Sequence, residues 1–237
     1  MTQAGPHERK SISADIERRI LGDILSGKLK PGLHLPTERQ MAEDFGVSRA
    51  SVHQAILDLE SQGFVSILPR HGIVVKDFRK YPTPQSLEAL MSNSSMELDR
   101  SIFNDMMDTR LWLESECARR ACTRITPEIM QEMEQTVEEM LKPGVDLERL
   151  TDQVFHFHYL LTQASGNSVY SMIFRGFESV LHTMIRYHYR VKSEDIVSSA
   201  ATCKELLGYI RRKDENAASD CVCRIIRQGI MVLEEQY

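Results

Sequence analysis

The sequence predicts a mainly α-helical fold, with an N-terminal helix–turn–helix unit, a small β-hairpin and a C-terminal antiparallel all-α bundle. Three observations predict it. Helical apolar periodicity recurs in three short segments before residue 63, two β-type runs follow, and everything beyond residue 85 is again helical in pattern. A stretch with two prolines, "RKYPTPQS", separates the two parts. We therefore expect domains at 1–78 and 85–237 joined by a linker at 79–84.

Each N-terminal element has its own local signal. A first helix is predicted over residues 11–26, where one stripe contains Ile12, Ile16, Ile20, Ile24 and Leu25. A second is predicted over 37–45 and ends at Gly46, a favoured residue after a helix. A third is predicted over 48–62 with Ser48 as its N-cap. "FVSILP" and "GIVVKDF" then predict two strands around the turn "RHG".

The C-terminal part predicts helices separated by polar breaks such as "KPGVD" and "SGN". The helices are expected near residues 85–96, 99–123, 126–141, 146–165, 167–190, 193–212 and 214–236. Thr126 followed by Pro127 is typical of a capped helix start.

Composition restricts the class of protein. No apolar run approaches the roughly 18 residues of a membrane span, and the N-terminus "MTQAGPHERK" has no apolar signal region, so we expect a cytoplasmic protein without membrane contact. The odd number of cysteines, 5, fits a reduced compartment. Residues 1–80 contain 12 Lys and Arg against 10 Asp and Glu, while the rest contain 17 against 24. This charge asymmetry permits an anionic partner for the N-terminal part of the chain.

The segment from the second to the third helix has helix–turn–helix spacing. We expect Ala42, Val47, Val52 and Ile56 to form its inner core, and the exposed set to be Ser48, Arg49, Ser51 and Gln54. Free backbone N–H groups at the start of the third helix can bind a phosphate, and Arg49 can fork onto guanine. Arg70 and His71 in the hairpin turn would reach an adjacent groove as a wing. The alternative is a packed helical hairpin with a solvated arginine.

The segment "LKPGLHLPTERQMAEDFGVSRASVHQAILDLESQGFVS" resembles the winged helix–turn–helix domain of the GntR family of bacterial transcription regulators. Its motif is leucine–proline–x–glutamate–arginine followed by valine–serine–arginine–x–x–valine. "DTRLWLESECARRA" and "FHYLLTQASGNSVYSMI" resemble the effector domain of that family's FadR group. The resemblance implies a ligand-responsive repressor or activator that binds a palindromic double-stranded DNA operator as a homodimer.

The resemblance also implies which residues touch DNA. In the family, DNA is contacted by residues that match Arg39, Ser48, Arg49, Ser51, His71 and Gly72. We add Arg70 from the wing, and His53, which stands where the family usually has arginine. Since "RHGIVV" also lacks the family's common glycine–threonine pair, a non-standard operator is expected.

Two effector chemistries are known in the group. Many members hold a divalent metal with one aspartate and three histidines. His158 matches the first histidine, but Val154 stands in place of the aspartate, and Cys203 and Ile225 lie where the other histidines would be. We therefore expect no metal and no other cofactor. Other members bind long-chain acyl-CoA without metal; "SGNSVYSMIFRGFESVLHTMIRYHYR" resembles them, although Ile226 and Leu233 replace a glycine and a tryptophan near their ligand.

The expected effector is an anion with an apolar part: an acyl-CoA, a fatty acid or a small organic acid. Arg110 matches a family arginine that points into the pocket, and Arg186 could join it, unless Arg110 pairs with Glu114 one turn on. The expected effector contacts are Arg110, His158, Asn167, Arg186, Tyr189 and Cys203. The apolar residues that suit either an adaptable cavity or an ordinary core are Trp112, Met106, Met107, Met172 and Met184.

Three alternatives stay open. The chain could be a metal-assisted carboxylate sensor of the same family, or a DNA-binding module whose helical domain binds no ligand. The third is an enzyme that uses His156, His158 and Cys203. The sequence has no "GxSxG", no "HExxH" and no glycine loop for phosphate, so an enzyme is not expected.

Overall fold

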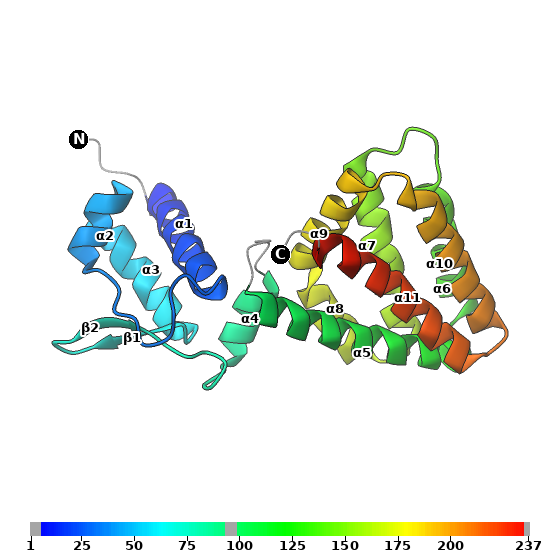
Figure 1. Cartoon of the computed structure of the whole chain (residues 1–237), viewed down its shortest axis with the longest axis horizontal. Helices are drawn as coiled ribbons and strands as arrows, with labels where there is room; N and C mark the ends of the chain where they lie inside the picture. The colour runs from blue at the N-terminus through cyan, green and yellow to red at the C-terminus, as the bar shows by residue number, and fades with distance from the viewer. Residues whose placement is uncertain (1–5, 93–98, 235–237) are drawn as a thin grey trace. The chain divides into compact units, whose positions relative to one another are not determined.

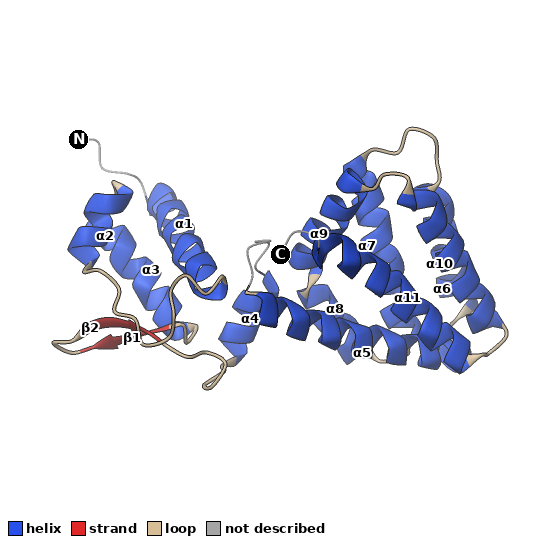
Figure 2. Cartoon of the chain, in the orientation of Figure 1, coloured by secondary structure: helices blue, strands red, loops and turns tan. Residues whose placement is uncertain are grey.

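The computed structural model describes residues 6–92 and 99–234 and divides the chain into two compact units, Met1–Asp99 and Arg100–Tyr237. The first unit has helices with a two-stranded sheet, and the described part of the second is helical throughout (Figures 1 and 2). This architecture confirms the predicted fold class. The expected linker, 79–84, lies inside the first unit. Within the described residues, no helix is long and apolar enough to cross a membrane.

The first unit packs its first three helices and a hairpin around one small core. Its elements are α1 (Pro6–Leu25), α2 (Glu38–Phe45), α3 (Arg49–Ser61), β1 (Val65–Leu68), β2 (Gly72–Val75) and α4 (Pro84–Ser92). Helix α3 packs against α1, α2 and β1. The isoleucine stripe of α1 faces this core, since Ile16, Ile20 and Ile24 are buried. Of the helix predicted near 85–96, residues 93–96 lie outside the described part of the chain.

The hairpin forms as predicted. Strands β1 and β2 pair antiparallel with Val65 opposite Val75 and Leu68 opposite Gly72. Arg70 and Gly72 have positive φ angles of 66° and 82°, and the amide of His71 donates to the carbonyl of Leu68, which closes the turn. The turn residues 69–72 are exposed, so the tip of the hairpin is available to a partner.

The second unit is built around α7. Its elements are α5 (Arg100–Arg124), α6 (Pro127–Met140), α7 (Leu147–Ala164), α8 (Ser168–Gly176), α9 (Glu178–Val191), α10 (Asp195–Arg211) and α11 (Glu215–Glu234). Helix α7 packs against α5, α6, α8 and α9, while α11 packs against α5, α9 and α10. Thr126 caps α6 with Pro127 in its first turn, as the sequence predicts.

One predicted helix, 167–190, is wrong: the structure has two, α8 and α9, with a break at Phe177. Phe177 has φ −82° and ψ 1°, outside the helical region, and its ring is buried together with that of Phe174. Gly176, which has low helix propensity, directly precedes the break. Apolar periodicity continues across the break, so the sequence pattern does not predict it.

Candidate nucleic-acid interface and effector cavity

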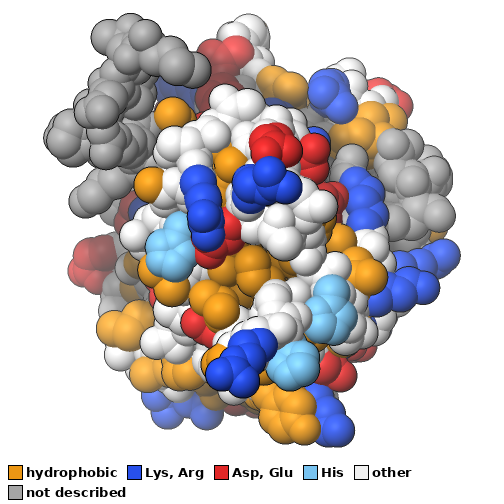
Figure 3. Space-filling view, turned by 90° about the vertical axis from the view of Figure 1, so that its left-hand side faces the viewer, with side chains coloured by type: hydrophobic (Ala, Val, Ile, Leu, Met, Phe, Trp, Pro, Cys, Tyr) orange, Lys and Arg blue, Asp and Glu red, His pale blue; other side chains and the backbone are white. Residues whose placement is uncertain are grey.

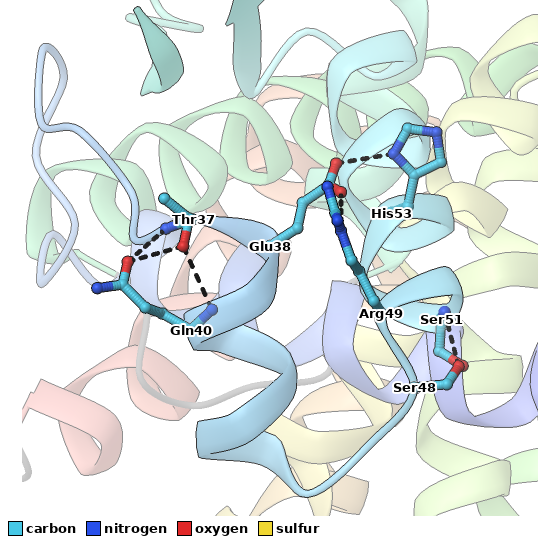
Figure 4. Close-up of polar contacts among 7 residues, drawn as sticks. All are labelled: Thr37, Glu38, Gln40, Ser48, Arg49, Ser51 and His53. Carbon is cyan, nitrogen blue, oxygen red and sulfur yellow. Dashed lines mark hydrogen bonds and ion pairs between the residues drawn. The ribbon is translucent and has the colours of Figure 1, made fainter.

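Two serines contact each other at the start of α3. Ser48 is the N-cap: its Oγ accepts a hydrogen bond from the Ser51 amide at 3.2 Å and lies 2.8 Å from Ser51 Oγ (Figure 4). Ser51 is only 5% exposed, so the expectation that it is exposed is wrong. Its hydroxyl is used inside the cap, whereas Ser48, Arg49 and Gln54 are exposed as expected.

The position of α2 is set by its two ends. Thr37 and Gln40 form a capping box, in which the Thr37 amide donates to Gln40 Oε1 at 3.0 Å and the Gln40 amide donates to Thr37 Oγ1 (Figure 4). Gly46 ends α2 with φ 66°, a conformation that glycine adopts without strain. In the core between α2 and α3, Val52 and Ile56 are fully buried, but Ala42 and Val47 are only half-buried.

The expected DNA-contacting side chains, apart from Ser51, are exposed: Arg39, Ser48, Arg49, His53, Arg70, His71 and also Gly72. Acidic neighbours accompany several of them. Arg39 lies 3.8 Å from Glu43, and Glu38 contacts both Arg49 and His53. Figure 3 views the side of the molecule that carries α2 and the hairpin, and shows Lys, Arg and His side chains interspersed with Asp and Glu. The surface is therefore not a continuous basic patch, and individual side chains must carry recognition.

A cavity lies between helices of the second unit. It is lined by Arg110, Val154, His158, Met184, Ile185, His188, Tyr189, Ser199, Ile225, Ile226, Gln228 and Gly229, and the volume open to the centre of a water molecule is about 60 Å³. These residues come from α5, α7, α9, α10 and α11. The wall is mainly apolar with a few convergent polar groups, which is the usual character of a small-molecule site.

The polar side of the cavity is a buried trio. Arg110 Nε donates to Glu114 Oε1 at 2.7 Å, and His158 Nδ1 contacts the other oxygen of Glu114. Arg110 thus pairs with Glu114 one turn on, as the alternative interpretation expected, and lines the cavity as well. Burial opposes ionisation of Glu114, but His158 and Arg110 outweigh it and lower the pKa of that carboxyl. An ionised Glu114 therefore balances Arg110 inside the fold.

His188 is a cavity residue that was not among the predicted contacts. It is 6% exposed; its Nε2 lies 3.4 Å from Asp195 Oδ2, and its Nδ1 is buried without a partner among the described residues. Burial lowers the pKa of His188 and outweighs the nearby Asp195 carboxylate, which raises it, while Lys192 adds a smaller lowering. The lowered pKa favours the neutral imidazole at pH 7. Buried polar atoms normally have partners, so the unpartnered Nδ1 of His188 is a departure from the usual pattern.

Three of the six predicted effector contacts meet in this cavity: Arg110, His158 and Tyr189. The other three lie elsewhere. Asn167 is the N-cap of α8, where its Oδ1 accepts from the Val169 amide. Arg186 is exposed and donates to Glu148 at 2.7 Å. Cys203 is buried outside the cavity lining, and burial raises the pKa of its thiol.

The donor set does not fit the group's metal. Val154 and Ile225, which replace an aspartate and a histidine, both line the cavity with apolar side chains. His158 contributes one ring nitrogen to Glu114. Within residues 6–92 and 99–234 there is no group of three His, Cys, Asp or Glu that could hold a metal ion.

Trp112 and the four methionines considered in the sequence lie in different environments. Trp112 and Met172 are 62% and 69% exposed, so the core interpretation is wrong for both, and neither lines the cavity that contains Arg110 and His158. Met106 and Met107 are core residues, and Met184 lines the cavity. The histidines of the enzyme alternative are separated: His156 lies at the surface against Glu132, while His158 is buried against Glu114. The side chain of Leu233 lies outside the described residues.

His188 makes folding stability depend on pH. Because its pKa is lowered from 6.5 in the folded chain, the unfolded chain binds more protons just below pH 6.5, and stability falls as the pH drops through that range. We expect the wild type to lose stability from pH 7.5 to 5.5 more steeply than His188→Gln, by at most about 1.4 kcal/mol per pH unit for one proton. Urea unfolding at a series of pH values measures this difference, and parallel curves would contradict it.

Comparison with known proteins identifies both parts of the chain. The family model of the FCD domain matches residues 105–228, and that of the gntR family of bacterial regulatory proteins matches residues 12–75. The chain belongs to the GntR family. This GntR-family protein combines the family's helix–turn–helix domain with an FCD domain, the arrangement of the FadR and LutR type, which confirms the resemblance seen in the sequence.

The relatives are named as transcription regulators. The chain is 32% identical over 126 residues to the HTH-type transcriptional regulator Mce2R of Mycobacterium tuberculosis (strain CDC 1551 / Oshkosh), an alignment that covers 53% of this chain and 52% of that protein. The chain thus spans about half the length of this relative. It is 22% identical over 214 residues to the galactonate operon transcriptional repressor of Escherichia coli (strain K12), covering 90% and 92%.

A solved structure shares the fold. It is that of Lar, described as controlling the expression of the Listeria monocytogenes agr system. The match has a TM-score of 0.62 at 17% sequence identity and covers 100% of both chains. At this identity the likeness concerns the fold alone.

Proposed function

We propose that this GntR-family protein is a cytoplasmic transcription regulator that binds duplex DNA through the start of α3 and the hairpin, and that a small anionic effector in the cavity changes this binding. The observation that carries the DNA part is the exposed Arg49 at the start of α3, in the segment matched by the family model. Backbone N–H groups at the same helix end suit a phosphate.

The proposed DNA-binding surface is small, and each copy of the chain offers one recognition helix, α3. We propose a homodimer on a palindromic operator, with half-sites about one helical turn apart, because a two-fold protein matches a two-fold site. Arg39, Ser48, Arg49 and His53 would meet one groove, and Arg70, His71 and Gly72 of the wing would meet the neighbouring one. Ser51 would act through the cap that it shares with Ser48.

The cavity volume favours a small organic acid over an acyl-CoA. About 60 Å³ open to water centres corresponds to roughly four to six water-sized groups. A long acyl chain with its nucleotide exceeds that space, whereas a short carboxylate does not. Arg110 lines the cavity and can offer its remaining N–H groups to a carboxylate.

The unpartnered Nδ1 of His188 adds a second feature to the effector. If Nε2–H faces Asp195, Nδ1 is an acceptor and requires a donor such as a hydroxyl. Arg110 and His188 together suit a short hydroxylated carboxylate. The relative named for a galactonate operon supports this class, since galactonate is a hydroxylated carboxylate.

A thermal-shift screen of hydroxy acids, simple carboxylates and acyl-CoAs tests the effector. We expect stabilisation by a short hydroxylated carboxylate, about 2.7 kcal/mol at 100 times Kd. Stabilisation by acyl-CoA alone would contradict the size argument. If no compound of these classes stabilises the protein, the result would favour the alternative of a DNA-binding module whose helical domain binds no ligand. No observation favours the metal-assisted alternative.

Gly229 allows the cavity to be filled without a clash. It lines the cavity, and a Cβ built on it meets no heavy atom within 4 Å. We expect Gly229→Val to abolish the ligand-induced shift while leaving the stability of the free protein within about 1 kcal/mol, because glycine is itself unfavourable in a helix. Thermal shifts with and without the best hydroxy acid measure this.

Gly22→Val is the matched control. Gly22 also lies in a helix with nothing within 4 Å of a built Cβ, but in the first unit. It should leave the ligand-induced shift unchanged. An undiminished shift in Gly229→Val would place the ligand outside this cavity.

A further inference from the structure

One carboxylate on α2 contacts two exposed side chains of α3. Glu38 Oε2 lies 3.5 Å from Arg49 Nε, and Glu38 Oε1 lies 2.7 Å from His53 Nδ1 (Figure 4). The side chain of Glu38 is only 20% exposed, whereas those of Arg49 and His53 are 73% and 54% exposed. The mostly buried carboxylate of Glu38 therefore contacts two side chains that are largely exposed to solvent.

The contact determines what Arg49 has left to offer. A guanidinium carries five N–H donors in a rigid plane. Glu38 occupies the Nε edge, so both terminal nitrogens remain for another partner. That terminal pair is the group that forms two parallel hydrogen bonds with O6 and N7 of guanine. Holding the side chain in advance also lowers the entropy lost when it binds.

The same carboxylate determines the tautomer of His53. An ionised carboxylate only accepts hydrogen bonds, so the ring nitrogen facing it, Nδ1, must carry the proton. In a neutral imidazole, Nε2 is then an acceptor. In the major groove, the groups that donate to such an acceptor are the amino groups of adenine and cytosine. The arginine usual at this position in the family could only donate.

We propose that Glu38 is the positioning residue of the DNA-reading surface: it directs the terminal nitrogens of Arg49 toward guanine and selects the His53 tautomer that reads adenine or cytosine. This inference rests on the proposed DNA-binding function and deepens it by naming how the bases are chosen. Glu38 acts through its two partners and needs no contact with DNA of its own.

Glu38→Gln tests the proposal with little change of shape. Operators are selected from randomised duplexes with the full chain at pH 8, and affinities for single-base variants are measured at one salt concentration. We expect the preference of Glu38→Gln for the wild-type operator over unrelated DNA to fall by about tenfold or more. Affinity for unrelated DNA should stay within about threefold, because no phosphate contact is lost.

The sharper readout is the base opposite His53. The amide of glutamine can donate to Nδ1, which moves the imidazole proton to Nε2. Preference at that base pair should then shift from adenine or cytosine toward guanine or thymine, which present acceptors. Glu38→Asp keeps the charge but shortens the side chain by one methylene, so it should lose the preference without this shift. A purely structural role for Glu38 would change neither base preference.

Two further variants separate the outcomes. Asp44→Asn removes an exposed carboxylate from the same helix and should keep the wild-type profile. If Glu38→Gln keeps that profile while Arg49→Ala loses it, the inference is overturned and the proposed function stands. If wild type shows no sequence preference, both fail. A uniform loss on all duplexes with a lowered melting temperature would make Glu38 a structural contact and also overturn the inference.

Discussion

Replacing Arg49 with alanine is expected to lower affinity for the selected operator by about 5- to 150-fold, while affinity for unrelated DNA changes little. A bidentate arginine–guanine pair contributes about 1–3 kcal/mol of discrimination, which sets that range. Arg49 is exposed at the first residue of α3 and its terminal nitrogens are free of Glu38, so the fold should tolerate the change. Gel shifts at fixed salt with both duplexes measure the two affinities, and sedimentation should report an unchanged oligomer.

Arg18→Ala supplies the control, because Arg18 is an exposed arginine of α1 that pairs only at the surface with Asp15 and is outside the expected contact set. It should leave the operator preference intact. An equal loss on operator and unrelated DNA, with a salt slope lower by about 0.9, would make Arg49 a phosphate contact. Unchanged affinity for both duplexes would remove Arg49 from the interface.

The helix ends of the first unit were predictable because their signals are local. Ser48, Gly46 and the proline before Thr37 each act within a few residues, and the structure places a cap at each of these ends. The contact between Ser51 and Ser48 had a local signal too, since the residue three positions after an N-cap lies beside the capping side chain. The contacts of Glu38 with Arg49 and His53 had no local signal in the sequence, because they depend on how α2 packs against α3.

The cavity residues depended on which face of α9 points inward. Met184 and Ile185 are buried, and residues four further along a helix share their face, so His188 and Tyr189 turn inward while Arg186 turns outward. This pattern is present in the sequence, and it would have replaced Arg186 by His188. Chemical reasoning from charge alone favoured the arginine. The exposure of Trp112 has no comparable signal, since its neighbours Leu111 and Leu113 are equally apolar.

Glu114→Gln is expected to destabilise the second unit by about 3–5 kcal/mol, the usual cost of removing one partner from a buried ion pair. Glu114 is fully buried and Arg110 is 8% exposed, so the guanidinium would be left without a counter-charge. For a unit of this size the melting temperature should fall by about 10 °C or more. Thermal and urea unfolding measure both quantities.

The contrast with two other variants shows whether charge is responsible. Glu116→Gln breaks a similar pair with Arg120, but both side chains there are about one-third exposed, so the change should stay within about 0.5 kcal/mol. The double variant Arg110→Met, Glu114→Leu should recover most of the stability, because it removes both buried charges.

Since the pKa of Glu114 is lowered, the contribution of its carboxylate is complete above pH 4.5 and is lost as the pH falls further. Glu114→Gln should therefore differ least from wild type in strong acid. A deficit that persists there undiminished would mean that the loss comes from packing, and that the trio holds the cavity by shape instead of charge.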